Sequence, residues 1–250
     1  MKISIAQFKS KLGAVDENFS TAARLIEAAQ NSDVILLPEL WSTGYYPTPV
    51  EKFADKGGWR TGEFICAAAK KFSVNIIGGS VILESGGRFY NHCLVVNRRG
   101  EITGEYVKTH LFSFAGEDKV FRAGNDISIV ELDGVKCGLA ICYDLRFPEF
   151  IRKIALAGAE IIFIPAAWSL KRLTPRQILT KARAIENQIF VVFANSSGFS
   201  EIINPLGESL AESGRGEEIL TAEINLSDRA EVIKTMNLLR DRNPNVDFFH

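Results

Sequence analysis

Residues 135–165 read VKCGLAICYDLRFPEFIRKIALAGAEIIFIP, and this stretch predicts a strand, a helix and a second strand in close succession. The first strand covers the apolar run 135–142. Pro148, a residue favoured at the first position of a helix, predicts a helix over residues 148–157. The run 161–165 is continuously apolar, as in a strand that is buried on both faces. Strand, helix and strand in this order are typical of an α/β fold.

The same alternation extends in both directions from this stretch. Asp133-Gly134 favours a hairpin between residues 127–132 and 135–142, so the sheet content should be mixed and not purely parallel. Asp16 or Asn18 is available to cap the first helix. No linker-like segment or internal repeat is visible, and we expect one domain over residues 1–250. The remaining strands are predicted at residues 34–37, 75–83, 89–97, 102–107, 189–195 and 219–224, with a strand and turn at residues 202–208, and the remaining helices at residues 16–30, 63–72, 175–188 and 228–236.

The composition is that of an ordinary globular protein. Hydrophobic residues make up 46% and charged residues 24% of the chain, which is enough apolar material for a sheet covered on both faces. The 29 basic and 30 acidic residues give a net charge of −1, without a long run of either sign. No electrostatic footprint for nucleic acid or for an anionic membrane surface is visible, so neither partner is expected.

Targeting signals and metal motifs are not visible either. Residues 1–8 alternate like a short strand and unlike a signal peptide, and no apolar stretch approaches the ~20 residues of a membrane span. The four cysteines do not resemble a disulfide framework, and the three histidines lack metal-binding spacing. We therefore expect a cytoplasmic protein with reduced thiols, no metal and no cofactor. Cys93 and Cys137 lie inside apolar runs and are expected in the core.

Three polar residues stand where apolar runs end. Glu39 follows the run 34–37 and Pro38, Lys108 follows the run 102–107, and Cys142 ends the run 135–142. Because open α/β sheets gather catalytic groups at the carboxyl ends of their strands, a carboxylate, an ammonium group and a thiol are predicted at one edge. Each also has an ordinary interpretation: the glutamate as a helix cap or surface charge, the lysine as a solvated side chain.

The surroundings of Cys142 suggest a reactive thiol. A helix beginning at Pro148 would bring backbone amides and its positive end close to the sulfur, and Lys108 would act in the same direction, so a lowered thiol pKa is expected. His92 and His110 are not obvious bases for this thiol. A buried carboxylate can serve as a base instead, and Glu39 is placed for that role.

Several segments closely resemble the signature segments of the nitrilase superfamily of carbon-nitrogen hydrolases, in the correct order. They are Pro38-Glu39-Leu40, residues 108–112 (KTHLF) and residues 138–149 (GLAICYDLRFPE), supported by residues 182–188 (ARAIENQ) and 204–208 (NPLGE). The resemblance spans nearly the whole chain. It implies a four-layer αββα sandwich that cleaves small amides, and homodimers that pair through the helices after the nucleophile, including residues 150–157 and 183–188.

The same resemblance implies roles for individual residues. Cys142 is the expected nucleophile, Glu39 the general base, and Lys108 the cation that stabilises the oxyanion together with the backbone N–H of Tyr143. Glu117 matches a second family glutamate that orients Lys108 or the substrate, with Asp118 as the alternative alignment. His110 is expected to have a structural hydrogen-bonding role.

The substrate is less clearly indicated. The version C-Y-D-L-R-F-P at residues 142–148 most resembles omega-amidases, which hydrolyse short dicarboxylic acid monoamides such as 2-oxoglutaramate and succinamate. Such substrates need a cation for the distal carboxylate, and the candidates are Arg146, Lys171, Arg172 and Arg176. Trp168 is expected to wall the pocket. The alternatives are hydrolysis of N-carbamoyl amines or N-carbamoyl amino acids, and a catalytically idle interaction module; the motif resembles amidases more than true nitrilases.

Overall fold

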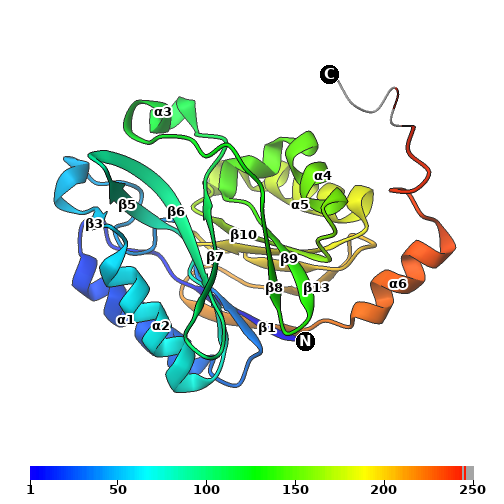
Figure 1. Cartoon of the computed structure of the whole chain (residues 1–250), viewed down its shortest axis with the longest axis horizontal. Helices are drawn as coiled ribbons and strands as arrows, with labels where there is room; N and C mark the ends of the chain where they lie inside the picture. Colours follow the sequence, from blue (N-terminus) through cyan, green and yellow to red (C-terminus); the bar gives the residue numbers. More distant parts are fainter. Residues whose placement is uncertain (244, 246–250) are drawn as a thin grey trace.

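The computed structural model describes residues 1–243 and 245. Two β-sheets face each other, with helices on their outer faces (Figure 1). The first sheet has the order β14-β1-β2-β4-β6-β5-β3, with β7 also paired to β6, and the second has the order β13-β12-β11-β10-β9-β8. The residues near the C-terminus whose role the sequence leaves open, 243–250, lie largely outside the described part.

The first sheet consists of β1 (Lys2–Gln7), β2 (Val34–Leu36), β3 (Asp55–Lys56), β4 (Asn75–Ile77), β5 (Val81–Ser85), β6 (Arg88–Val96), β7 (Ile102–Val107) and β14 (Glu218–Glu223). The second consists of β8 (Ser128–Leu132), β9 (Val135–Leu139), β10 (Ile161–Ala166), β11 (Phe190–Asn195), β12 (Glu201–Ile203) and β13 (Ser209–Glu212). Both contain parallel and antiparallel pairs, as predicted: β1-β2 and β10-β11 are parallel, whereas β8-β9 is antiparallel.

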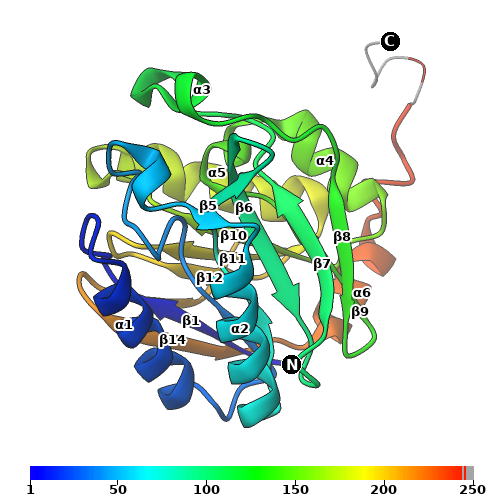
Figure 2. The ribbon, with the colours of Figure 1, turned by 60° about the vertical axis from the view of Figure 1, so that its left-hand side comes forward.

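The helices cover the two outer faces. Helices α1 (Val15–Ala28) and α2 (Trp59–Phe72) lie on the first sheet, and α4 (Pro148–Leu156) and α5 (Leu173–Asn187) lie on the second (Figure 2). The predicted four-layer αββα arrangement is therefore confirmed. The short helix α3 (Glu117–Val120) and the helix α6 (Leu226–Thr235) complete the α-helical elements in the described part of the chain. No helix there is both apolar and long enough to span a bilayer.

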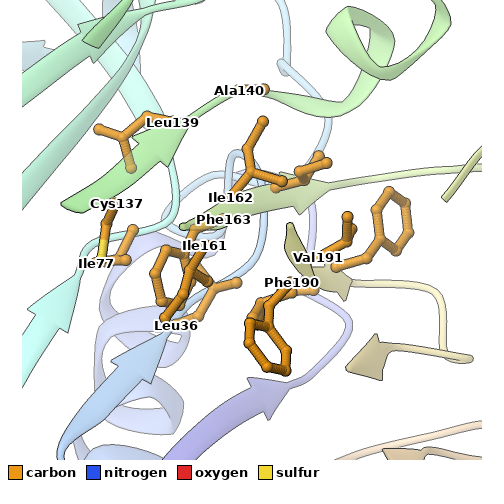
Figure 3. Packing of buried hydrophobic residues seen from close by; sticks show 14 of the residues in the cluster. Leu36, Ile77, Cys137, Leu139, Ala140, Ile161, Ile162, Phe163, Phe190 and Val191 are labelled. Carbon is orange, nitrogen blue, oxygen red and sulfur yellow. The ribbon is translucent and has the colours of Figure 1, made fainter. Parts of the chain in front are cut away.

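The largest hydrophobic cluster fills the space between the sheets. Leu36 and Ile77 of the first sheet lie against residues of the second, among them Leu139 and Phe163 (Figure 3). Cys137 belongs to this cluster, as predicted, and Cys93 is also buried in it. Because the side chains of both sheets contribute to one dry interior, the strand ends are held in fixed positions relative to each other.

The predicted strand 75–83 is wrong in one respect, because it is two strands with a break at Gly78-Gly79-Ser80. Gly79 has φ +61°, and a Cβ atom there would lie 2.2 Å from the carbonyl oxygen of Pro38. Ser80 donates its N–H to that oxygen at 3.0 Å, and its hydroxyl accepts the N–H of Leu40 at 3.0 Å. The turn that carries Glu39 therefore packs against the break and is hydrogen-bonded to it.

Two further expectations at element ends are wrong. Helix α1 begins at Val15 without a side-chain cap, because Asn18 is buried and bonded to the backbone of Lys11 and Ser42. The strand predicted to reach Cys142 ends at Leu139, and Cys142 opens a 3-10 helix, η3 (Cys142–Arg146). The hairpin at Asp133-Gly134 is present, with φ +51° and +81°.

Candidate active site

The three residues singled out at strand ends lie together. Glu39 follows β2, Lys108 follows β7, and Cys142 follows β9, so both sheets contribute. The Glu39 carboxylate lies close enough to the Cys142 thiol to shift the thiol pKa, and the Lys108 ammonium group donates to Glu39 Oε1 at 2.8 Å. The side chains of Glu39 and Lys108 are almost completely buried. The site is thus a compact group of one thiol, one carboxylate and one ammonium group.

A second carboxylate completes the surroundings of Lys108. Glu117 begins α3, and its Oε1 and Oε2 accept from Lys108 Nζ at 3.0 and 2.9 Å. The backbone N–H of Phe112 donates to Glu117 Oε2 at 2.8 Å, which fixes the carboxylate from the other side. The structure places Glu117, and not Asp118, beside the lysine.

Cys142 lies in a strained turn that neighbouring groups stabilise. Its φ of +46° is in the left-handed region, which is unfavourable for any residue with a Cβ atom. Asp144, fully buried, accepts the N–H of Ile141 at 2.8 Å and the hydroxyl of Tyr106 at 2.8 Å with one oxygen. Its other oxygen accepts the N–H of His110 at 2.9 Å and lies 2.7 Å from His110 Nδ1. His110 therefore has the hydrogen-bonding position expected for it.

The electrostatics differ from the expectation for the thiol. Burial and the adjacent Glu39 carboxylate raise the pKa of Cys142 well above that of an ordinary cysteine, although Lys108 opposes this. The lowered pKa predicted from the sequence is therefore wrong. Two carboxylates surround a single ammonium group, so a resting thiolate would add a second uncompensated negative charge. Burial and the Glu39 carboxylate thus both favour the protonated form of the thiol.

The charges of the other two groups follow from the same arrangement. Burial opposes the charge of Lys108, but attraction by Glu39, Cys142 and Glu117 outweighs it and raises the lysine pKa. Burial also raises the pKa of Glu117, while the contact with Lys108 opposes that shift. The two carboxylates thus favour the charged form of Lys108 at the centre of the site.

Three residues of the site were not identified from the sequence. Asn91, on β6, donates its side-chain N–H to Glu39 Oε1 at 2.9 Å, and the backbone N–H of Ala167 donates to Glu39 Oε2 at 2.8 Å. The hydroxyl of Tyr45 donates to Glu117 Oε1 at 3.0 Å. Asn91 lies inside an apolar strand, where a buried asparagine is a usable signal. Nothing in the local sequence of Tyr45 or Ala167 distinguishes them.

The thiol opens into a cavity of about 210 Å³. Four of the residues predicted to contact the substrate line it: Tyr143, Trp168, Arg146 and Arg172. The other lining residues are Tyr45, Phe112, Cys142, Ala167 and Ser169. The volume equals about seven water molecules of the liquid, which suits a small molecule. A larger groove of about 750 Å³ between α1 and α2 shares none of these residues.

Aromatic rings hold the two cavity arginines in place. The Arg146 guanidinium lies 4.6 Å from the ring centre of Trp168, and that of Arg172 lies 5.6 Å from the ring centre of Phe112. The other two residues that were candidates for binding the substrate carboxylate do not line the cavity. Arg176 is buried and paired with Glu201 at 2.6 Å, and Lys171 is exposed.

No group of three or more histidine, cysteine, aspartate or glutamate side chains that could hold a metal ion occurs within residues 1–243 and 245. The site consists of a thiol with a carboxylate within hydrogen-bonding reach, a fixed cation and a small cavity, on a four-layer α/β fold. This combination defines a cysteine-dependent hydrolase.

Comparison with known proteins specifies the family. The carbon-nitrogen hydrolase family model matches residues 2–234. The chain is 41% identical to the 2-oxoglutaramate amidase of Bacillus subtilis over 96% of both chains. It is 30% identical to an omega-amidase of Xenopus laevis, covering 96% of this chain and 94% of that one. A carbon-nitrogen hydrolase superfamily protein of Xanthomonas campestris, solved with an arsenic adduct in its active site, superimposes with a TM-score of 0.92 at 27% identity, covering 100% of this chain and 98% of that one.

The chain therefore belongs to the carbon-nitrogen hydrolase family. The family and the enzyme class expected from the sequence are confirmed.

Proposed function

We propose that this protein is an omega-amidase, which removes the terminal amide of short dicarboxylic acid monoamides such as 2-oxoglutaramate and succinamate. The observation that carries the proposal is the cavity itself. It contains the Cys142 thiol and, in the same lining, the guanidinium groups of Arg146 and Arg172. A substrate with an amide at one end and a carboxylate at the other matches this pairing of a nucleophile with cations. The similarity to a 2-oxoglutaramate amidase supports the same substrate class.

The proposed reaction begins with proton transfer from the thiol. Glu39 accepts that proton while the sulfur of Cys142 attacks the amide carbonyl carbon, and the carbonyl oxygen becomes an oxyanion. Lys108 and the backbone N–H of Tyr143 stabilise this charge, since N–H groups in a first helical turn have no acceptor within their helix. Glu117 holds Lys108 in position.

The second half of the reaction returns the enzyme to its starting state. Glu39 gives its proton to the departing nitrogen, so ammonia leaves and a thioester remains on Cys142. Glu39 then takes a proton from water, which attacks the thioester, and the carboxylic acid product leaves as the thiol is restored. Because Glu39 and Lys108 act in both halves, loss of either should reduce the rate by at least about 10²-fold.

Ammonia release from a panel of substrates tests the proposal. The panel contains succinamate, 2-oxoglutaramate, N-carbamoylputrescine, an N-carbamoyl amino acid, asparagine and an aliphatic nitrile. We expect the first two to be the best substrates, and Cys142→Ala to abolish their turnover with an unchanged circular dichroism spectrum. Preference for a carbamoyl compound or a nitrile would overturn the substrate class. No ammonia from any amide would overturn the amidase itself and favour an interaction module.

The arginines are tested separately. Arg146→Leu and Arg172→Leu should each raise the KM for succinamate by about 10-fold to 100-fold, because a charged hydrogen bond is lost. The KM for propionamide, which has no carboxylate, should change little. Lys171→Leu is the matched control, since Lys171 belongs to the same 3-10 helix as Arg172 (η4, Leu170–Arg172) but is exposed. An equal loss on both substrates would contradict carboxylate recognition.

We also infer that the protein is a cytoplasmic homodimer with a single domain. The four cysteines are free thiols, which supports a reducing compartment. Ile178 and Ile185 on α5 and the neighbouring Leu206 are large apolar side chains that are 62%, 48% and 58% exposed, which supports pairing through this helical layer. The hydrophobic cluster shared by the two sheets supports one cooperative unit.

A further inference from the structure

Asn91 connects two groups of the active site. Its side-chain N–H donates to Glu39 Oε1 at 2.9 Å, and its backbone carbonyl accepts the N–H of Lys108 at 2.9 Å. Glu39 Oε1 also accepts from Lys108 Nζ. One residue of β6 thus fixes the side chain of the carboxylate and the backbone of the cation. Its own position is set by pairing with Ile82 of β5, and it is completely buried.

The polarity of this contact favours one charge state. A side-chain N–H can only donate, so Glu39 Oε1 accepts in this contact, and the hydrogen bond is stronger when the carboxylate is charged. The carbonyl oxygen of the same amide is buried without a hydrogen-bond partner among the described residues. A buried asparagine that leaves one of its two ends unpaired gains little as a structural element. The end that is paired points at the proposed base.

We propose that Asn91 is a positioning residue that holds the Glu39 carboxylate oriented toward the thiol by donating a hydrogen bond to it, and that the loss of this bond changes the pH profile of the reaction. Asn91 does not line the cavity and makes no contact with the substrate in this assignment. It acts through Glu39. The inference rests on the proposed amidase function, in which Glu39 takes the proton of Cys142.

The experiment compares the pH profiles of kcat/KM of the wild-type enzyme and of Asn91→Leu. Both are measured with the amide that the wild-type enzyme hydrolyses best. Without the donated hydrogen bond, the acid limb should move to higher pH by about one unit, because a hydrogen bond to a charged group stabilises that charge. At the optimum, kcat should fall by about 10-fold or more, while KM changes less than threefold. Asn91→Asp preserves the packing volume and puts a second carboxylate beside Glu39, so it should move the limb further in the same direction. If Asn91→Leu does not fold, Asn91→Asp is the variant that tests the inference.

Asn75→Leu is the matched control. Asn75 is a buried asparagine on β4, the strand paired with β6, and its side chain bonds Asp33 and Asp133 away from the site. This variant should lose thermal stability but keep the wild-type acid limb. If Asn91→Leu also keeps the wild-type acid limb, or loses activity through KM alone, the inference about Asn91 is wrong. If the wild-type enzyme hydrolyses no amide, the proposed function fails instead, so the two failures are distinguishable.

Discussion

At the scale of single residues, the most consequential is Cys142, because it combines a strained backbone with a protonated sulfur. Its left-handed φ costs about 1–2 kcal/mol for a residue with a Cβ atom. The hydrogen bonds that Asp144 accepts from Ile141, Tyr106 and His110 offset this cost by holding the turn. The turn places the sulfur against Glu39. In the proposed reaction, this geometry would couple proton transfer to attack by the sulfur, without a preformed thiolate.

This arrangement predicts an unusual pH dependence of thiol reactivity. The pKa of Cys142 is raised, so its reaction with a small neutral disulfide should increase only above pH ~8.5, the ordinary thiol value. Glu39→Gln removes a negative charge that raises this pKa, so it should react faster than wild type at pH 8 and still hydrolyse amides at least about 10²-fold more slowly. Cys142→Ala gives the background from the half-buried Cys66. A wild-type midpoint at or below 8.5 would contradict the assignment.

At the scale of elements, the break between β4 and β5 determines where Glu39 lies. Gly79→Ala should disturb the site, because a Cβ atom would collide with the backbone at Leu37 and Pro38. Gly86→Ala is the control: Gly86 also has positive φ, but a Cβ atom added there would meet no other atom within 4 Å. We expect Gly86→Ala to cost about 1 kcal/mol with full activity, and Gly79→Ala to cost about 1–3 kcal/mol more.

The measurements for this pair are urea denaturation and amide hydrolysis. Gly79→Ala should lower kcat in the folded protein, because Glu39 moves with Pro38. If the two variants have equal stabilities and equal rates, Gly79 is needed only for its positive φ. The turn that carries Glu39 would then not depend on the break between β4 and β5.

The same break illustrates what the sequence can and cannot predict. Continuous apolar runs correctly indicated β2 and β10, because a strand buried on both faces needs such a segment. The pattern could not indicate that Gly78-Gly79 interrupts a strand, since the reason is a turn about 40 residues earlier in the chain that packs there. In the site, Glu39, Lys108 and Cys142 were found because they end apolar runs. Asn91 and Tyr45, which were missed, are recognisable only by their hydrogen bonds to Glu39 and Glu117, residues far from them in sequence.

The prediction of a lowered pKa for the Cys142 thiol failed for a related reason. Local features around Cys142, a following helix and a lysine, favour a lowered value. The dominant effects are burial and the Glu39 carboxylate, and both arise only when the two sheets come together. Charge balance within a site is a property of the assembled group, and the sequence around one member does not contain it.

At the scale of the whole molecule, the helical layer of α4 and α5 predicts self-association. Ile185→Glu places a charge among the exposed apolar side chains of α5, so it should convert a dimer to a monomer in light scattering coupled to size-exclusion chromatography. Trp59→Glu is the control, since Trp59 is 74% exposed at the start of α2, on the opposite outer layer. A wild-type monomer, or dissociation by Trp59→Glu alone, would refute pairing through α5.

The pairing of β1 with β14 has a consequence for how this chain is made. Lys2 lies opposite Glu223, and the amino group of Met1 donates to the carbonyl of Ile224 at 2.9 Å. During synthesis β1 can pair with β14 only after the more than 200 residues between the two strands have been made. Such distant pairing slows folding and leaves an open strand edge in the nascent chain. Because an open strand edge can pair with other chains, we expect nascent chains that stop before β14 to aggregate more readily than chains that include it.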